Sequence, residues 1–426
     1  MAPPIMRTDG PRLLAINNYF YRRGGAEAVF FDHMSLFAEM GWDVVPFAMK
    51  HEKNEPSKWS DYFVSEIEYG NQQGFVTKAL DAAKVIYSFE AQRKLAQLIA
   101  AAPPMIAHAH NVYHHLSPAI FSTLKNAGVP VVMTAHDLKL ACPAYKMLRQ
   151  GSICEQCKGG HIYKVALNRC VKDSAAVSGV VFIETLVHRL LGLYRDKIDR
   201  IVVPSRFYRE KLIEWGWPPE KLVYIPNFVD ASQMKADWIE QDYFVYAGRL
   251  APEKGIATLI RAAALAGQKL VIAGTGPEEN ALRDLARTVN ADVMFAGYVS
   301  GENLHRLIGE SKALVLPSEW YENAPISILE AYALGRPVIG SAIGGIPEMI
   351  KEGETGRIAK AGSPDDLAQA LNELASLSAA DRTAMGRLGR AWIQEEFSPQ
   401  AYKRRMLDLY ATLTPLDLAA VRPYGT

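Results

Sequence analysis

The chain has 426 residues, more than one ordinary hydrophobic core accommodates, and this length suits two large domains. Its 47 basic and 46 acidic residues leave a formal net charge of +1, which argues against nucleic acid as a main partner. No apolar run reaches the roughly 20 residues that a membrane-spanning helix needs, and the first ten residues lack the apolar core of a signal peptide. We therefore expect a globular protein located in the cytoplasm.

Apolar, β-rich runs alternate with helical stretches along the chain, which predicts an α/β protein with parallel sheets. A first series of strands is expected at residues 13–16, 43–47, 105–108, 131–134, 201–203 and 222–225. A second series is expected at residues 243–247, 270–273, 293–296, 313–316 and 337–340. A polar stretch without a strand pattern, residues 229–242, separates the two series. We therefore expect domains over residues 1–232 and 233–396, followed by a helix within residues 397–426.

Two stretches, residues 80–101 and 181–200, have the pattern of amphipathic helices. The second places basic side chains among leucines, namely Arg189, Arg195, Lys197 and Arg200. One interpretation is a helix that packs on the sheet and exposes a solvated, charged face. The other is contact with an anionic membrane surface, which basic amphipathic helices favour.

In the first domain, glycine and histidine residues follow expected strands. Gly25 opens a helix after the first strand, where the missing side chain permits close approach of a phosphate group, although a plain glycine turn is the alternative. His136 follows the strand at 131–134, at the carboxyl end where ligands bind in such sheets, although a lone histidine is more often structural. His110, Asn111 and His114 crowd the preceding segment with a spacing that fits no standard metal site.

In the second domain, Arg249 and Lys254 lie in the loop between the first strand and its helix. Arginine offers a planar fork to phosphate oxygens and lysine adds a compact charge. The alternative is two solvated loop cations. The nearby Gly274-Thr275-Gly276 sequence lacks the third glycine of a dinucleotide fingerprint, because Glu279 stands in its place.

The segment from residue 316 to 348 joins a strand end, two glutamates separated by seven residues, a helix and a glycine turn. The helix is expected to start within Asn323-Ala324-Pro325-Ile326, and its free amides attract phosphate oxygens. Glu322 lies just before this helix and Glu330 about two turns inside it. One carboxylate can therefore face a transferred group and the other a more distant part of the same ligand.

Glu322 and Glu330, together with Gly344-Gly345-Ile346-Pro347-Glu348, resemble the retaining family 4 glycosyltransferases, and the likeness extends from Asn17 to about Tyr410. The resemblance implies the GT-B fold: two Rossmann-like, doubly wound domains facing a central cleft, with a C-terminal helix crossing back to the first domain. It also implies transfer of a sugar from a nucleotide-diphosphate donor, with retention of configuration, to a hydroxyl of a glycan or lipid-linked acceptor.

The resemblance assigns roles to the residues above. His136 and Glu322 are the implied catalytic residues, and His110, Asn111 and His114 are expected on the acceptor side. The donor is expected to contact Gly25, Arg249, Lys254, Asn323, Ala324, Pro325, Ile326 and Glu330. No D-x-D sequence occurs, so we expect no catalytic metal, and the cations and amides would neutralise the diphosphate.

The acceptor is predicted from a second likeness. Residues 108–118 and the cysteine segment resemble bacterial members that build surface polysaccharides, which favours a lipid-linked acceptor and peripheral contact with the inner face of the cell membrane. Three alternatives stay open: a glycoside hydrolase that uses Glu322 and Glu330, a nucleotide-sugar 2-epimerase of GT-B fold, and a non-catalytic subunit of a polysaccharide assembly complex.

The four cysteines of the chain lie within 29 residues, in an expected insertion at about 140–175. They are Cys142, Cys154, Cys157 and Cys170, and the middle two form a C-x2-C pair. Four thiolates in one short segment can close a tetrahedral, structural Zn²⁺ site. Four free or partly oxidised thiols are the alternative.

Overall fold

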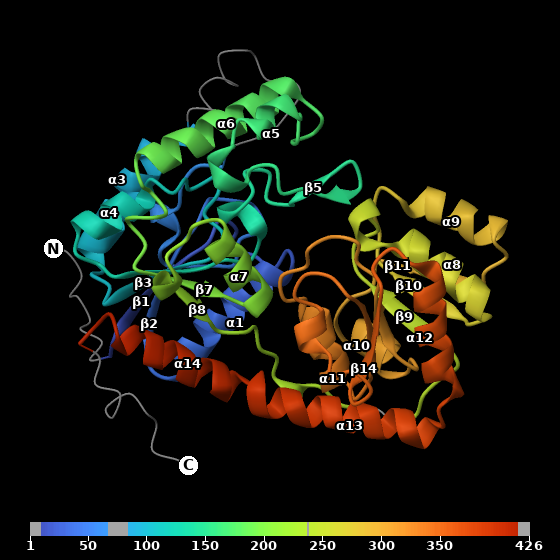
Figure 1. The fold of residues 1–426 in the computed structure, drawn as a ribbon. Helices are drawn as coiled ribbons and strands as arrows, with labels where there is room; N and C mark the ends of the chain where they lie inside the picture. Colours follow the sequence, from blue (N-terminus) through green and yellow to red (C-terminus); the bar gives the residue numbers. More distant parts are fainter. Residues whose placement is uncertain (1–9, 67–83, 237, 416–426) are drawn as a thin grey trace.

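The computed structural model describes residues 10–66, 84–236 and 238–415, and within them the chain forms two six-stranded parallel sheets (Figure 1). The first sheet has the order β2-β1-β3-β4-β7-β8, with strands β1 (Arg12–Ile16), β2 (Asp43–Phe47), β3 (Ile106–Ala109), β4 (Val131–Thr134), β7 (Arg200–Val203) and β8 (Leu222–Tyr224). The second has the order β11-β10-β9-β12-β13-β14, with β9 (Phe244–Ala247), β10 (Leu270–Ala273), β11 (Val293–Gly297), β12 (Leu314–Leu316), β13 (Val338–Ser341) and β14 (Gly356–Ala359).

Helices cover both sheets, as the alternating sequence pattern predicts for parallel sheets. Those of the first half are α1 (Gly25–Glu39), α3 (Phe89–Ala101), α4 (Ile120–Asn126), α5 (Lys164–Leu167), α6 (Ala175–Leu190) and α7 (Arg206–Glu214). Those of the second half are α8 (Ile256–Ala266), α9 (Glu279–Thr288), α10 (Gly301–Gly309), α11 (Ile326–Ala333), α12 (Pro364–Ser376), α13 (Ala379–Glu396) and α14 (Pro399–Ala411). Among the described residues, none of these helices combines the length and apolar character needed to cross a lipid bilayer.

The eleven predicted strands are all present, each within one residue of its expected bounds. Three strands were not predicted: β14 and the small antiparallel hairpin of β5 (Leu148–Arg149) and β6 (Ser152–Ile153). β14 is a four-residue edge strand whose sequence, GRIA, has only two large side chains. The hairpin strands have two residues each, too few to form a pattern.

The two amphipathic predictions need correction. The second helix, α6, starts at Ala175 and ends at Leu190 rather than spanning 181–200. Ser174 fixes its start because its hydroxyl accepts a hydrogen bond from the Val177 amide, and Gly192 turns the chain away in a left-handed conformation. In the first, α3 starts only at Phe89, after the capping residue Ser88, and residues 80–83 lie outside the described part of the chain.

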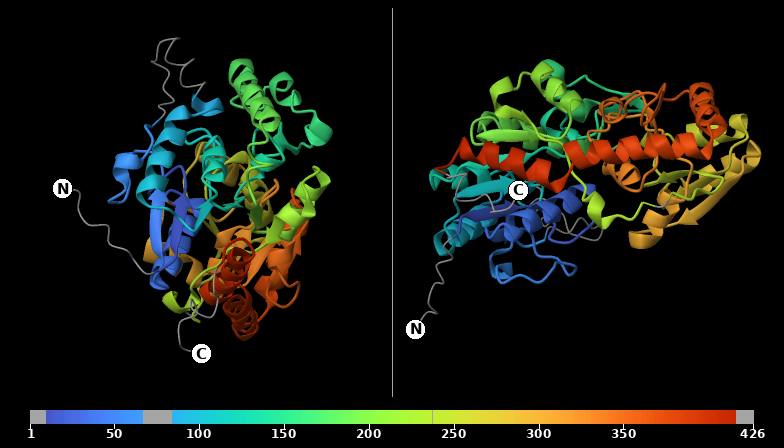
Figure 2. Two further views of the ribbon diagram at one scale, coloured as in Figure 1. Left: turned by 90° about the vertical axis from the view of Figure 1, so that its left-hand side faces the viewer. Right: turned by 90° about the horizontal axis from the view of Figure 1, so that it is seen from below.

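The predicted C-terminal helix consists of α14, and it packs on the first sheet after α13 has packed on the second half of the chain (Figures 1 and 2). The chain bends at Phe397, and α14 then starts at Pro399 with Ser398 as its cap. Its apolar face, which includes Tyr402, Met406 and Tyr410, lies against strand residues of β1, β3, β4 and β7. This confirms the predicted return of the C-terminal helix to the first domain, as far as Pro415, where the described part ends.

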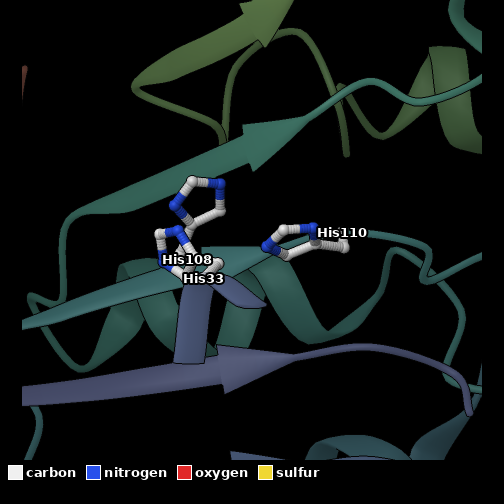
Figure 3. A group of neighbouring side chains, drawn as sticks. All are labelled: His33, His108 and His110. Carbon is white, nitrogen blue, oxygen red and sulfur yellow. The ribbon is translucent and has the colours of Figure 1, made fainter. Parts of the chain in front are cut away.

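His33, His108 and His110 form a buried cluster (Figure 3). Two tyrosine hydroxyl groups of α14 contact it. The Tyr410 hydroxyl lies 2.6 Å from Nδ1 of His108 and 3.2 Å from Nε2 of His33, and the Tyr402 hydroxyl lies 3.0 Å from Nδ1 of His33. The ligand nitrogens of His33, His108 and His110 lie within 4.8 Å of one another. The nitrogens of the first two already have hydroxyl partners, so we interpret the cluster as a buried polar anchor for α14 rather than as a metal site.

The anchor makes stability depend on pH. Burial, followed by the charge of His136, lowers the pKa of His33 to about 3, whereas an unfolded histidine titrates near about 6.5. As the pH falls through this window, the unfolded chain takes up a proton that the folded chain does not, so the free energy of unfolding decreases. The contribution approaches about 1.4 kcal/mol per pH unit for each such group.

We therefore predict that His33→Gln flattens this dependence, because it removes one group that binds a proton only in the unfolded state. Urea unfolding at several pH values between about 7 and about 5 would measure the slope. The absolute stability of the variant is also expected to fall, since Tyr402 loses its partner. An unchanged slope would contradict the assignment of proton uptake to His33.

Candidate active site

The loops at the carboxyl ends of the two sheets meet at the segment from Glu322 to Ile326. The Asn323 side-chain amide donates hydrogen bonds to the carbonyl oxygens of Ala135 (2.9 Å) and His136 (3.1 Å) at the end of β4. Its oxygen accepts a hydrogen bond of 2.6 Å from the Ser205 hydroxyl. The structure therefore brings the predicted segment directly against the predicted histidine, from sequence positions 187 residues apart.

The start of the first domain's α1 lies on the other side of the same segment. A Cβ atom at Gly25 would lie 3.4 Å from Cδ1 of Ile326, which is an ordinary van der Waals contact. Two predicted donor residues from different halves of the chain are therefore neighbours.

Glu322 is buried and holds two hydrogen bonds through one carboxylate oxygen. Oε1 accepts from the Lys254 ammonium group at 2.7 Å and from the Ser318 hydroxyl at 2.7 Å. The backbone of the loop is fixed by Gly344 and Gly345, where an added Cβ would clash with the carbonyl oxygens of Glu322 and Asn323. Gly344 also has a φ of +61°, which favours glycine. The glycine turn of the sequence motif thus positions the Glu322 backbone.

Arg249 has an acidic partner that the sequence interpretation missed. Its guanidinium group donates a hydrogen bond of 2.6 Å to Oε1 of Glu253, and the Lys146 ammonium group of the first domain reaches the same oxygen at 3.2 Å. Burial pushes the pKa of Glu253 up, but its own amide and the two cations outweigh this and lower it. Arg249 lies in the loop after β9 and Glu253 in a single 3-10 turn, so the helical rule for residues four apart did not apply to them. Lys146 lies in the other half of the chain, and its sequence position gave no signal either.

Glu330 lies deeper in the same region. Because α11 begins at Ile326, after the capping residue Pro325, Glu330 lies at the start of the second helical turn rather than two full turns inside. Burial raises the pKa of its carboxyl group, with smaller opposing influences from His305 and Asp32. Within the described chain, the carboxylate has no ion pair within 4 Å.

His136 is paired with His110 behind the cleft. The His110 Nδ1 and His136 Nε2 atoms are 2.8 Å apart, and the two rings are stacked with their centroids separated by 5.1 Å. Burial lowers the pKa of His136 to about 4 and that of His110 well below its ordinary value. Both rings are therefore neutral at neutral pH, and one of the two shared nitrogens carries the proton.

Asn111 and His114, the other two residues predicted on the acceptor side, lie in different surroundings. The Asn111 backbone amide donates a hydrogen bond of 2.9 Å to the Asn17 side-chain oxygen. Burial raises the pKa of the Glu27 carboxyl group near the start of α1, and both asparagine side chains act in the opposite direction. Nδ1 of His114 instead lies 3.6 Å from the Glu184 carboxylate of α6. Asn111 therefore stays at the cleft, whereas His114 faces the helix that covers the insertion.

Further residues that join the two halves were also missed. The Glu348 carboxylate accepts hydrogen bonds from the amides of Arg206 and Phe207, at 3.0 and 3.3 Å, and so caps the start of α7. Asn227 donates a hydrogen bond of 3.0 Å to the carbonyl of Ala324. Glu348 ends the recognised sequence motif, but its partner lies 142 residues away and could not be read from the sequence.

The four cysteines lie in the segment that connects β4 to α6, and all four thiols are free and half-buried. Cys154 and Cys157 follow the hairpin of β5 and β6, and Cys142 and Cys170 flank them.

Comparisons with known proteins agree with this geometry. The family model described as "Glycosyltransferase Family 4" matches residues 23–233, and that described as "Glycosyl transferases group 1" matches residues 233–392. A GDP-mannose-dependent alpha-(1-6)-phosphatidylinositol monomannoside mannosyltransferase of Mycobacterium tuberculosis is 30% identical over 50% of this chain and 62% of its own length. An amylovoran biosynthesis glycosyltransferase of Erwinia amylovora is 27% identical over 50% of this chain and 57% of its own. The matches thus span little more than half of these relatives.

Solved structures extend the likeness of the fold to nearly the whole chain. Sucrose-phosphate synthase from Thermosynechococcus elongatus has a TM-score of 0.69 at 20% identity, covering 95% of this chain and 99% of that one. The Anabaena protein HepE, solved with UDP and glucose, has a TM-score of 0.65 at 14% identity, covering 94% and 100%. Together, the two family models and the two-sheet architecture place this chain in family 4 of the glycosyltransferases, with a GT-B fold.

Proposed function

We propose that the protein is a retaining hexosyltransferase that moves a sugar from a nucleotide-diphosphate donor to a hydroxyl of a lipid-linked glycan, in bacterial polysaccharide biosynthesis. One observation supports the proposal most directly. Glu322, Lys254 and the start of α11 lie together on one side of the cleft, and Asn323 holds them against the end of the strand that carries His136.

The donor diphosphate fits the cationic side of this arrangement. Arg249 is more than half exposed and Lys254 lies at the cleft, and each is matched by a carboxylate in the donor-free state. A diphosphate can replace these carboxylates as the partner of both cations, while the free amides at the start of α11 supply further donors. Glu330, for which no ion pair within 4 Å is found among the described residues, can accept hydrogen bonds from ribose hydroxyls.

The proposed reaction breaks the bond between the sugar C1 and the phosphate oxygen and forms a bond from C1 to the acceptor oxygen on the same face. The acceptor proton passes to the departing diphosphate. Negative charge that develops on the leaving oxygen meets fixed donors, usually the largest contribution in such sites. His136 remains neutral and oriented by His110, so that it can hydrogen-bond to the donor sugar without adding charge. Glu322 orients Lys254 and the sugar.

Protein cations are assigned the role that a divalent metal fills in enzymes with a D-x-D sequence. Arg249 and Lys254 bring two positive charges to the position proposed for the diphosphate. We therefore infer that turnover is independent of Mg²⁺ and Mn²⁺.

The acceptor side is proposed to contact the inner face of the membrane. α5 and α6 expose an apolar strip formed by Leu167, Val177, Ile183, Leu186, Leu190 and Leu191. Ile183, Leu186 and Leu190 repeat at helical spacing, and Leu190 is 77% exposed. The basic residues Lys164, Arg189 and Arg195 lie beside this strip, which suits an anionic lipid surface. A cavity of about 360 Å³ beneath α6, lined in part by Lys139, Trp215 and Trp217, offers polar and aromatic groups to a glycan.

Turnover assays with UDP-, GDP-, ADP- and dTDP-sugars, with and without lipid-linked acceptors, test the proposed reaction. We expect acceptor-dependent release of nucleoside diphosphate in the presence of EDTA, and a product whose anomeric proton coupling matches that of the donor. Free epimer formed without acceptor would instead indicate an epimerase. Complete absence of turnover with intact donor binding would favour a binding subunit, and an inverted product would refute retention.

We predict that Arg249→Ala and Lys254→Ala each weaken binding of both the sugar nucleotide and the free nucleoside diphosphate by about tenfold or more, because a charge-assisted hydrogen bond contributes roughly 1.5–3 kcal/mol. Calorimetric titration with each ligand measures the loss. Arg261→Ala, which removes an exposed cation of α8, is the matched control and should bind normally. Unchanged diphosphate affinity in both cation variants would refute the donor site.

We also predict that Glu330→Ala weakens nucleoside binding but leaves the binding of inorganic pyrophosphate unchanged.

For the membrane surface, we predict that the double variant Leu186→Ser/Leu190→Ser loses most of its binding to anionic vesicles, about tenfold or more, since each buried leucine side chain contributes roughly 1.5–3 kcal/mol. Flotation with vesicles containing an anionic phospholipid provides the measurement, and added salt should weaken wild-type binding. Leu388→Ser is the matched control. It removes a leucine of α13 that is also exposed, and it should leave vesicle binding unchanged. Equal effects of both changes would argue against a surface on α6.

A further inference from the structure

The cysteine insertion, residues 141–174, has very little hydrophobic core of its own. Two of its buried apolar residues, Ala141 and Met147, belong to the core around the first sheet. Ala144 and Val165 form a separate small cluster with Val181 of α6, against which Cys142 and Cys170 pack. Of the nine non-glycine residues with positive φ in the described chain, six lie here: Tyr145, Met147, Gln150, Arg169, Lys172 and Asp173. Such backbone conformations are costly unless the surroundings hold them in place. The insertion therefore needs a constraint that hydrophobic packing does not supply.

Backbone hydrogen bonds hold the C-x2-C pair beside the loop that carries Cys142. The Cys154 amide donates a hydrogen bond of 2.8 Å to the carbonyl of Met147, and the Tyr145 amide donates one of 2.8 Å to the carbonyl of Cys142. The turn after Cys142 and the start of the C-x2-C pair are therefore neighbours.

The remaining two thiols lie in the same region. Cys157 ends the C-x2-C pair that begins at Cys154, and Cys170 packs with Cys142 against the same small apolar cluster. Arg189 of α6 reaches the insertion, because its Nη1 atom lies 4.0 Å from the position that a Cβ atom would take at Gly160. Four thiolates around Zn²⁺ carry a net charge of −2, and a cation at this place would offset part of it.

We propose that Cys142, Cys154, Cys157 and Cys170 bind one Zn²⁺ ion as a tetrathiolate site, and that this site holds the insertion as a clasp across the cleft. Zinc bound tetrahedrally at about 2.3 Å from each sulfur requires sulfur atoms about 3.8 Å apart. In the described part of the chain, the histidine cluster is the one group of three or more ligand atoms within 4.8 Å of one another, so zinc binding would have to draw the four sulfur atoms closer together. Gly151, Gly159 and Gly160, all with positive φ, lie between the cysteines and permit this movement.

The clasp reaches the second half of the chain at two points beside the donor residues. Glu155, between the paired cysteines, accepts hydrogen bonds from the Tyr321 hydroxyl at 3.1 Å and from the Lys211 ammonium group at 2.9 Å. Lys146, in the Cys142 loop, donates to Glu253 at 3.2 Å. Tyr321 precedes Glu322 in the chain. A metal that orders the insertion therefore orders both contacts without taking part in the chemistry.

Metal analysis of the full chain, purified under reducing conditions without chelators or a metal-affinity step, tests the site directly. We expect about one Zn²⁺ per chain, and release of that ion as a mercurial reagent titrates the thiols. After exchange with Co²⁺, we expect thiolate-to-cobalt charge-transfer absorption and the intense visible bands of a tetrahedral site. None of these measurements depends on catalytic activity, so the zinc site and the proposed function can fail independently.

Variants distinguish the cysteines from other ligands. Cys157→Ser should lose most of the zinc and the charge-transfer band, whereas His161→Ala, which removes an exposed histidine of the same insertion, should retain both. His110→Asn should also retain zinc; its loss there, with Cys157→Ser unaffected, would assign the metal to the histidine cluster and overturn the proposal. Absence of metal and of a cobalt spectrum in reduced, reconstituted wild-type protein would overturn it regardless of how the variants fold.

Discussion

The hydrogen bonds of the Asn323 side chain across the cleft set the distance between the two sheets. Its amide donates to the carbonyls of Ala135 and His136, and its oxygen accepts from Ser205, so every polar atom of this side chain is directed at the first domain. Each bond contributes only about 1 kcal/mol net, but a buried amide without partners would cost more. The contact therefore defines a closed arrangement in which Glu322 cannot move away from the β4 end without leaving these groups unsatisfied.

The charges around this contact are arranged in pairs. Glu322 holds Lys254, and Glu253 holds Arg249 together with Lys146. A cation kept in place by a carboxylate is already oriented before an anion arrives, which lowers the cost of binding the anion in the correct geometry. The same pairing limits the net free energy of anion binding, since the incoming anion must replace the carboxylate that already pairs with each cation. A ligand with two negative charges would compensate both displaced carboxylates at once, which supports the diphosphate proposed for this position.

The sequence predicted the strands well because buried parallel strands form continuous apolar runs, as in Val131–Thr134. It also predicted the residues that follow those strands, since in such folds the carboxyl ends of neighbouring strands share one edge. The partners of those residues were not predictable. Lys254 and Glu322 are 68 residues apart, and Lys146 and Glu253 are 107 apart, and no local pattern connects them. The predicted helix bounds were wrong where a capping serine or a turn glycine determines the end of the helix, as Ser174 and Gly192 do for α6.

The two faces of the cleft also differ in whether their residues come from neighbouring or from distant parts of the sequence. Most residues predicted to bind the donor lie in loops of the second sheet, so a short motif contains most of them and they could be proposed together from the sequence. The opposite side is assembled from an insertion, α6 and the segment after β3, which meet only in three dimensions. His114 illustrates this: its neighbours in the sequence lie at the cleft, yet its ring faces Glu184, a residue of α6 that also holds Lys139. A side built from long-range contacts can change by altering one insertion without disturbing the donor loops. The insertion that carries the four cysteines is therefore the part of this chain that can vary most independently of the predicted donor loops.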